Sequence, residues 1–217
     1  MKPPFVIAVD GPAASGKGTI SSDLSAHYGL PMLDTGLLYR AVGVILNRQG
    51  GHLDDALAAA RVARDLQAGD LDDDHFRTRE AGECASRVAV HPEVRAALLD
   101  LQQVFSQRPG GSVIDGRDIG TVIAPSAPAK LYVTADPEVR AERRFKQLKG
   151  RGEDVVFAEI LEDIRRRDER DGGRADAPMV QAPDAVLLDT SQMSIERATD
   201  AARRIVEAAR ARWENSQ

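Results

Sequence analysis

Short apolar runs alternate along this chain with longer stretches in which apolar residues recur every three or four positions. The run 5–9 is unbroken and of strand length, which is typical of a strand covered on both faces. Further strand candidates lie at 112–114, 130–134 and 185–188, and segments of helical periodicity separate them. This alternation predicts an α/β fold, with helices wound on both sides of a parallel sheet.

Helix ends are marked by capping residues. A first helix is expected from Lys17 up to Gly29, a residue that suits a left-handed helix end, and a second helix begins just after Asp34-Thr35-Gly36. Asp136-Pro137-Glu138 has the order of an N-cap, a first-turn proline and an acidic first turn. A last amphipathic helix is expected after a Ser194 cap.

Size and charge limit the kind of protein. A chain of 217 residues suits one domain, 1–217, with at most a small insert. The net charge of −5 excludes a surface that is basic throughout, as a nucleic acid polymer would require, so any phosphate site is local. Apolar runs are too short for a membrane span and there is no leader-like segment, so we expect a cytoplasmic protein. No leftover apolar stripe demands a partner, so we expect a monomer.

Cysteine and histidine offer little chemistry. Cys84 is the single cysteine, which excludes an intramolecular disulfide and favours a packed, inert thiol. The histidines lack the spacing of metal ligands, so we expect no transition metal bound by the protein.

A glycine-rich segment joins the first strand to the first helix. It reads Gly11-Pro12-Ala13-Ala14-Ser15-Gly16-Lys17, which fits the first seven positions of the Walker A pattern in the strand-to-helix context that this pattern requires. Glycines let backbone N–H groups surround phosphates, and Lys17 adds an ammonium beside the positive end of the helix. We therefore expect this loop, with the Gly18 and Thr19 that follow, to bind the phosphates of ATP.

The residue after Lys17 departs from the strict pattern. Ser or Thr is expected there, whereas Gly18 intervenes and the hydroxyl follows at Thr19. The form Gly-Lys-Gly-Thr resembles the phosphate loop of nucleoside monophosphate kinases, which favours a small-molecule kinase over a GTPase or a motor ATPase.

Two further segments carry polar residues at the ends of predicted elements. Asp34-Thr35-Gly36-Leu37-Leu38-Tyr39-Arg40 alone is an ordinary capped helix start. Val113-Ile114-Asp115-Gly116-Arg117-Asp118-Ile119-Gly120-Thr121 is an apolar strand that ends in an acid, a glycine, an arginine and a second acid. Because ligands bind at the carboxyl ends of parallel strands, Asp115 either orders the water shell of a magnesium ion or caps the loop, and both interpretations stay open.

An arginine-rich segment spans 165–174. Arg167, Asp171 and Arg174 fall at i, i+4 and i+7 of a helix, and in isolation they would be surface ion pairs of little energetic value. Phosphoryl transfer, however, needs cations around the moving group and the exclusion of water, which an arginine-rich lid provides. Gly150-Arg151-Gly152 offers a hinge for such a lid.

Together these segments resemble the bacterial cytidylate kinases. The likeness runs from Val6 to the last helix and rests on four motifs, which lie at 11–19, 34–40, 115–121 and 167–174. It implies a P-loop NTPase-type three-layer fold, with a central parallel sheet flanked by helices, a monophosphate-binding insert at 35–95 and a short lid at 149–174. Family members often carry a small antiparallel sheet in the insert, for which 52–78 is too short and too polar; short helices and loops are expected there.

The resemblance also implies residue roles. Arg140 and Arg144 would flank the adenine and line the donor phosphates, Asp118 would accept a hydrogen bond from the amine of cytosine, and Arg170 would contact a phosphate. The residues expected to bind the acceptor are Thr35, Arg40, Ser86, Arg95, Arg117, Asp118, Arg167, Asp171 and Arg174, and those expected to be catalytic are Lys17, Arg117, Arg167 and Arg174. Without the resemblance, Ser86 and Arg95 would be assigned to a solvated helix face.

The implied reaction is in-line transfer of the γ-phosphoryl group of ATP to CMP or dCMP. Magnesium would be held mainly through the ATP phosphates and water, and no general base is needed because the attacking phosphate oxygen is already anionic. Two alternatives stay open: another small-molecule P-loop kinase, acting on UMP or a non-nucleotide acceptor, and a regulatory nucleotide switch. The arginines beyond the donor loop argue against a switch, which needs no acceptor pocket.

Overall fold

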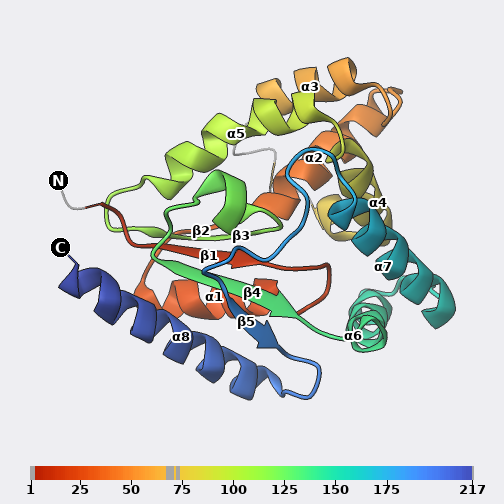
Figure 1. Ribbon diagram of the computed structural model, residues 1–217. Coiled ribbons are helices and arrows are strands. Elements are labelled where there is room, and N and C mark those ends of the chain that lie inside the picture. The colour runs from red at the N-terminus through yellow and green to blue at the C-terminus, as the bar shows by residue number, and fades with distance from the viewer. Residues whose placement is uncertain (1–2, 67–70, 72–73, 217) are drawn as a thin grey trace.

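Five parallel strands form the centre of the protein (Figure 1). The structure is a computed structural model and describes residues 3–66, 71 and 74–216. In sheet order the strands are β2 (Met32–Asp34), β3 (Ser112–Gly116), β1 (Val6–Asp10), β4 (Ala129–Thr134) and β5 (Val186–Asp189). Each strand is parallel to its neighbours, which confirms the expected sheet.

Helices cover both faces of the sheet, as Figure 1 shows. On one face lie α1 (Lys17–Tyr28) and α8 (Ile195–Asn215), and on the other lie α5 (Pro92–Ser106) and the short π-helical turn η3 (Ile119–Ile123). Ile7 and Val9 of β1 pack toward α1 and α8, whereas Val6 and Ala8 pack toward η3. Burial on both faces explains the unbroken apolar run, and the three-layer α/β fold is confirmed.

The insert between β2 and β3 is helical. It contains α2 (Thr35–Arg48), α3 (Ala56–Asp65), η2 (Asp74–Arg77) and α4 (Arg79–Val88), which pack with α5 around a core of their own. The described part of 52–78 contains no strand, in agreement with the expected helices and loops, while 67–70 and 72–73 lie outside the described residues. Cys84 is buried in this core, as expected.

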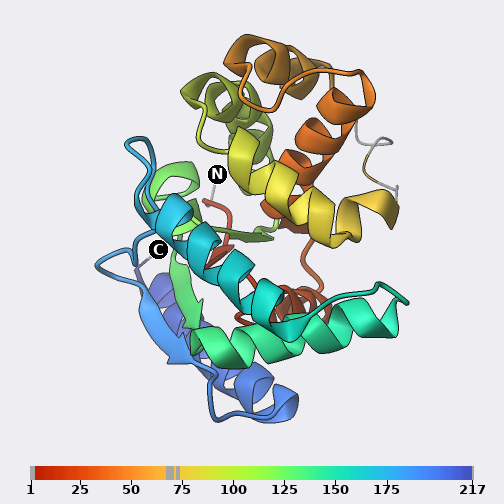
Figure 2. The same cartoon turned by 90° about the vertical axis from the view of Figure 1, so that its right-hand side faces the viewer.

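Two helices form a hairpin beside the sheet. They are α6 (Pro137–Gly150) and α7 (Phe157–Gly172), with Gly152 between them at a φ of 81°. Figure 2 shows α7 lying against α4 of the insert. Arg79 of α4 binds Asp163 at 2.6 Å, and Arg170 of α7 binds Glu83 at 2.9 Å. The arginine-rich segment is therefore docked on the insert.

No described helix is both long and apolar enough to span a membrane.

The helix caps follow the sequence closely. Asp34 accepts from the backbone of Leu37, Ser194 accepts from that of Arg197, and Gly29 is left-handed with a φ of 63°. Asp136 stands at the N-cap as expected, but its side chain makes no capping hydrogen bond. The sequence missed β2, because three partly buried residues are too few to form a recognisable apolar run.

Asp10 ties the end of β1 to η3. Its carboxylate is buried and accepts hydrogen bonds from the backbone N–H groups of Ile119 at 2.8 Å and Gly120 at 2.7 Å. Burial raises the pKa of Asp10 to about 6, against an ordinary value of 3.8. The loop that carries Asp118 is thus fixed to the strand that precedes the glycine-rich loop.

We predict that Asp10→Asn destabilises the fold more at pH 5 than at pH 7.5. The pKa of Asp10 is higher in the folded than in the unfolded chain, so binding of a proton to Asp10 stabilises the fold. This stabilisation is fully present below about pH 3.8 and is lost as the pH rises through about 6. An amide cannot ionise and keeps only one acceptor oxygen. Urea unfolding of both proteins across this range measures the difference in free energy, and Asp100→Asn on the exposed face of α5 is the control. A difference that stays constant or grows with pH would contradict the prediction.

Candidate active site

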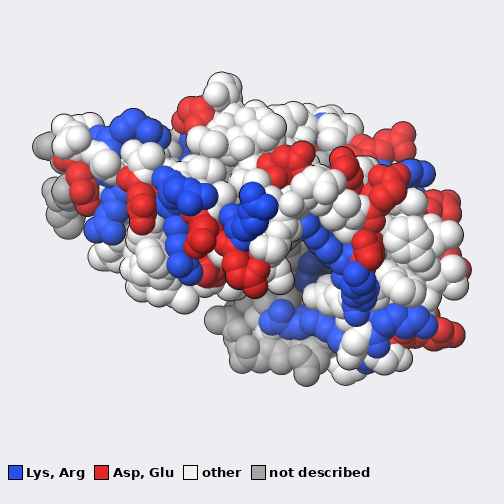
Figure 3. Space-filling view, turned by 90° about the horizontal axis from the view of Figure 1, so that it is seen from below, with Lys and Arg blue, Asp and Glu red and all other residues white. Residues whose placement is uncertain are grey.

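A cavity of about 1020 Å³ lies at the carboxyl ends of the strands. It is bounded by the glycine-rich loop, the insert, and the hairpin of α6 and α7, and Figure 3 shows basic side chains gathered around a hollow on this side of the molecule. The basic residues that line it are Lys17, Arg40, Arg77, Arg79, Arg117, Arg143, Arg144, Arg151 and Arg167. Such a group of cations in a cavity selects anionic ligands.

The glycine-rich loop adopts a backbone that few other residues would accept. A Cβ on Gly11 would lie 2.0 Å from the carbonyl oxygen of Val133, and Gly16 has a φ of 97° at the start of α1. Ala14 is also left-handed, with a φ of 59°, a conformation that costs roughly 1–2 kcal/mol for an L-residue. Strain of this kind is often retained where a loop binds a ligand, and the start of α1 adds a partial positive charge.

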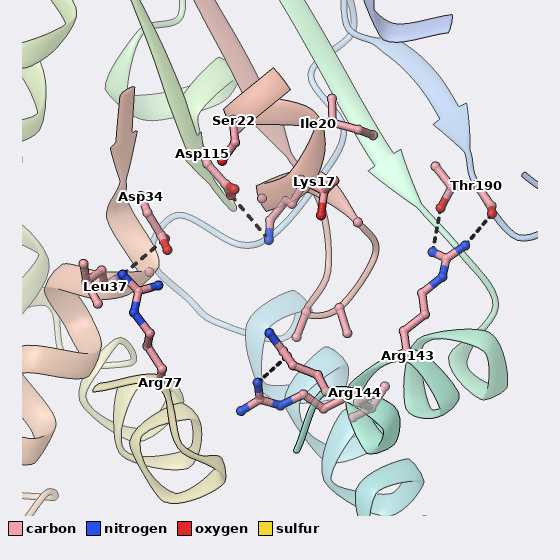
Figure 4. A pocket seen from close by; sticks show the side chains of 18 of the residues that line it. Lys17, Ile20, Ser22, Asp34, Leu37, Arg77, Asp115, Arg143, Arg144 and Thr190 are labelled. Atoms are coloured by element: carbon pink, nitrogen blue, oxygen red, sulfur yellow. Dashed lines mark hydrogen bonds and ion pairs between the residues drawn. The ribbon is translucent and has the colours of Figure 1, made fainter. Parts of the chain in front are cut away.

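Lys17 and Asp115 form an ion pair inside the cavity (Figure 4). The ammonium nitrogen lies 3.4 Å from a carboxylate oxygen of Asp115, and both side chains are buried. Burial and the nearby Arg117 lower the pKa of Lys17 to about 8. Burial likewise raises the pKa of Asp115. Both charges are therefore poorly solvated, and an anion beside Lys17 would restore its ordinary pKa.

Two carboxylates stand side by side at this end of the sheet. Asp34 of β2 and Asp115 of β3 are register partners, and both line the cavity near Lys17. The described residues contain no group of three or more His, Cys, Asp or Glu side chains that would enclose a metal ion. One or two carboxylates beside a phosphate site do fit magnesium, which usually keeps several waters and binds substrate phosphates.

Arginines from three further elements face the same space. Arg40 comes from α2, Arg117 from the loop after β3, and Arg144 and Arg167 from the hairpin. Burial lowers the pKa of both Arg144 and Arg167 to about 10, and the Nε of Arg167 is buried without a hydrogen-bond partner among the described residues. Guanidinium groups held in this way are well placed to bind a phosphate by two hydrogen bonds.

A second polar cluster lies beside this cavity under α7. Asp118 pairs with Arg95, Ser86 donates to Asp171 at 3.4 Å, and all of these side chains are buried. Arg117 joins the cluster to the cavity, because its Nε donates to Asp171 at 3.1 Å. The structure thus brings together residues that the sequence separates by up to 85 positions. Asp118 is already paired with an arginine here, a contact that its position in the sequence does not reveal.

Most of the expected site residues form two groups, and Gly11, Pro12, Ser15, Thr35 and Arg140 belong to neither. Those that line the cavity are Ala13, Ala14, Gly16, Lys17, Gly18, Thr19, Arg40, Arg117, Arg144 and Arg167. Those of the adjoining cluster are Ser86, Arg95, Asp118, Asp171 and Arg174, the last donating to the carbonyl oxygen of Ala177 at 2.9 Å. Thr35 donates to the carbonyl oxygen of Asp115 at 2.8 Å.

Arg140 occupies a different place from Arg144. Its side chain is 4% exposed and pairs with Asp168, and it also donates to the carbonyl oxygens of Ala135 and Ala13. It therefore supports the glycine-rich loop, and the expected contact with adenine remains a prediction.

Arg143, Thr190 and Arg77 also lie at the site, although no sequence motif gave them a role. Arg143 and Thr190 line the cavity and bind each other, as Figure 4 shows, and Arg77 reaches the cavity from η2. Arg143 shares its helix with Arg140 and Arg144, and this grouping of arginines was the sequence signal for it. Thr190 follows the last strand, and ligands gather at the carboxyl ends of strands.

Known proteins match this chain along almost its whole length. Cytidylate kinase of Caulobacter vibrioides is 73% identical over 208 residues, covering 96% of this chain and 98% of the relative. Cytidylate kinase of Xanthobacter autotrophicus is 63% identical, covering 95% and 99%.

Solved structures support the fold alone. An uncharacterised protein of Eubacterium ventriosum has a TM-score of 0.57 at 15% identity, covering 94% of this chain and 98% of its own. A sugar kinase of Janibacter sp. has a TM-score of 0.51 at 17% identity, covering 94% and 95%.

The sequence model of the cytidylate kinase family matches residues 7–208. With this match and relatives of such high identity, the chain belongs to the cytidylate kinase family.

Proposed function

We propose that this enzyme transfers the γ-phosphoryl group of ATP to CMP and dCMP, giving ADP and the nucleoside diphosphate. The observation that carries the proposal is that the glycine-rich loop and a separate group of arginines face one cavity. Two phosphorylated substrates can therefore be bound with their phosphates next to each other. The printed names of the relatives agree with this reaction.

The donor binds along the glycine-rich loop in this proposal. Backbone N–H groups of residues 13–19 and the ammonium of Lys17 hold the β- and γ-phosphates. Arg144 neutralises the same phosphates from α6. Burial lowers the pKa of its guanidinium, and a phosphate beside it offsets this by stabilising the charged form. Asp115 and its neighbour Asp34 would hold the water shell of a magnesium ion, which would supply positive charge beside the donor phosphates.

The acceptor binds between the insert and α7. Arg40, Arg117 and Arg167 hold its phosphate, and the cluster of Ser86, Arg95 and Asp118 surrounds the pyrimidine. A cytosine amine donates to the carboxylate of Asp118, whereas uracil places a carbonyl oxygen against that carboxylate, which then keeps only its pairing with Arg95. Asp171 and Arg174 complete the site, as contacts to the ribose and the phosphate.

Catalysis follows from position and charge. The attacking oxygen of the acceptor phosphate is already anionic, so it needs no base, and the cations of Lys17, Arg117, Arg167 and Arg174 stabilise the charge that spreads over the transferred group. Residues 35–95 serve as the acceptor-binding insert and 149–174 as the lid that excludes water. Within this proposal the enzyme is a cytoplasmic monomer.

A coupled assay of ADP release tests the reaction directly. With ATP and magnesium, we expect CMP and dCMP to give rapid release and UMP and AMP to give little. Preferred turnover of UMP would favour another small-molecule kinase. Absence of stimulation by any monophosphate would refute the kinase proposal and leave a nucleotide-binding switch.

We predict that Asp118→Asn lowers the ratio of kcat/KM for CMP to that for UMP by roughly tenfold or more. One well-placed polar contact to a base contributes about 1–3 kcal/mol of discrimination, and each 1.4 kcal/mol is a factor of ten. Steady-state kinetics with both acceptors gives the ratio. Asp100→Asn, on an exposed face of α5, is the control and should leave it unchanged. An unchanged ratio in Asp118→Asn would remove Asp118 from base recognition.

We predict that ATP binding takes up more protons at pH 8.5 than at pH 7. The pKa of Lys17 is about 8, so part of this side chain is neutral at pH 8.5, and the bound phosphates raise its pKa and restore the proton. Calorimetric titration in two buffers of different ionisation enthalpy measures the uptake. Lys146→Met, with 72% of the lysine side chain exposed, should behave as the parent, whereas Lys17→Met should lose the increase. Equal uptake by the parent at both pH values would contradict the prediction.

A further inference from the structure

Two side chains from distant parts of the chain bind the carbonyl oxygen of Ser15, within the glycine-rich loop. The hydroxyl of Thr190 donates to this oxygen at 2.9 Å, and the Nη1 of Arg143 donates to it at 3.2 Å. Thr190 follows β5, and Arg143 lies on α6, which leads into the hairpin. Neither contact is required for the loop to join β1 to α1.

Arg143 and Thr190 are also bound to each other (Figure 4). Arg143 donates to the Thr190 hydroxyl at 2.9 Å and to its carbonyl oxygen at 2.7 Å. The backbone N–H of Thr190 in turn donates to the carbonyl oxygen of Thr134, at the end of β4, at 2.9 Å. Thr190 is 2% exposed, so its hydroxyl is held in a fixed position on the sheet.

The carbonyl is the group that anchors Ser15. The hydroxyl of Ser15 is buried without a hydrogen-bond partner among the described residues. The hydroxyl of Thr190 has a single proton, and two acceptors are within its reach. They are the carbonyl oxygen of Ser15 at 2.9 Å and that of Thr134 at 3.1 Å. The oxygen of the same hydroxyl accepts a hydrogen bond from Arg143. Arg143 therefore leaves the proton of Thr190 free to be donated to a carbonyl.

The orientation of this carbonyl fixes the next N–H group. A trans peptide unit is planar, so the C=O of Ser15 and the N–H of Gly16 point in opposite directions. With the C=O directed at Thr190 and Arg143, the N–H of Gly16 points to the other side of the loop. Gly16 lines the cavity beside Lys17 and, with a φ of 97°, stands at the positive end of α1.

We infer that Thr190 is a positioning residue for phosphoryl transfer: with Arg143, it turns the Ser15–Gly16 peptide so that the Gly16 N–H donates to the phosphates of the donor. The inference rests on the proposed function, because it takes the glycine-rich loop as the donor phosphate site. It also gives α6 a direct link to the loop, since Arg143 belongs to the helix that carries the hairpin.

The test compares Thr190→Val with Thr190→Ser. Valine has nearly the shape of threonine but no hydroxyl, whereas serine keeps the hydroxyl. Inorganic tripolyphosphate, which has no base or ribose, is titrated calorimetrically, and steady-state kinetics with ATP and CMP is measured on the same samples. Ser25→Ala, which removes a hydroxyl that donates to the carbonyl oxygen of Leu30 at 2.6 Å on the far end of α1, is the control, and thermal unfolding is recorded for every variant.

We expect Thr190→Val to weaken tripolyphosphate binding and to raise the KM for ATP by the same factor. That factor is roughly tenfold, because the hydrogen bond from the Gly16 N–H to a charged phosphate is lost. The KM for CMP should stay within about twofold of the parent. Thr190→Ser should restore both values, and Ser25→Ala should leave them unchanged.

Three results would overturn the inference. The first is tripolyphosphate binding by Thr190→Val equal to that of the parent, including a case in which only the KM for ATP rises, because Thr190 would then touch the nucleoside. The second is an equal loss for ATP and CMP with a lower unfolding temperature, which would indicate a structural role. The third is a parent that turns over CMP without binding tripolyphosphate. A parent that fails to phosphorylate any monophosphate refutes the proposed function instead.

Discussion

The repulsion among basic side chains around one cavity is the constraint on which the rest of this structure depends. Lysine and arginines from the glycine-rich loop, the insert and the hairpin converge there, and burial lowers the pKa of Lys17, Arg144 and Arg167. Asp115, paired with Lys17, and Asp171, paired with Arg117, neutralise part of this positive charge. Anions bound in the cavity would offset more of this charge, as the substrate phosphates do in the proposed function.

The sheet supplies the fixed points that hold these cations in place. Asp10 at the end of β1 anchors the turn after Asp118, and Thr190 after β5 anchors the carbonyl of Ser15. α7 is docked on α4 by partly exposed ion pairs such as that of Arg170 with Glu83, and by the buried contact of Ser86 with Asp171. Partly exposed pairs of this kind contribute little stability each.

Much of the fold could be predicted from the sequence, because its signals are local. The apolar run of β1, the caps at Asp34 and Ser194, and the glycine-rich loop each depend on a few neighbouring residues. β2 was missed because its three residues pair with β3 only through the tertiary fold. Short strands of this kind are defined by their partners.

The site was predictable as far as motifs reach. The motifs identified Lys17 and Arg117, but the pairing of Asp118 with Arg95 and the contacts of Arg140 behind the loop depend on which elements meet in space. Thr190 lies in no motif, and its contact with Ser15 spans 175 positions. Interactions of this range follow from topology and are invisible to periodicity or spacing.

The most direct test of the account is whether the cavity binds two phosphorylated ligands at once. Calorimetric titration of CMP, and of an ATP analogue that cannot transfer its γ-phosphoryl group, is performed for each ligand alone and with the other at saturation. The account predicts one equivalent of each, with both retained in a ternary complex. Displacement of CMP by the analogue would show a single phosphate site and contradict the account.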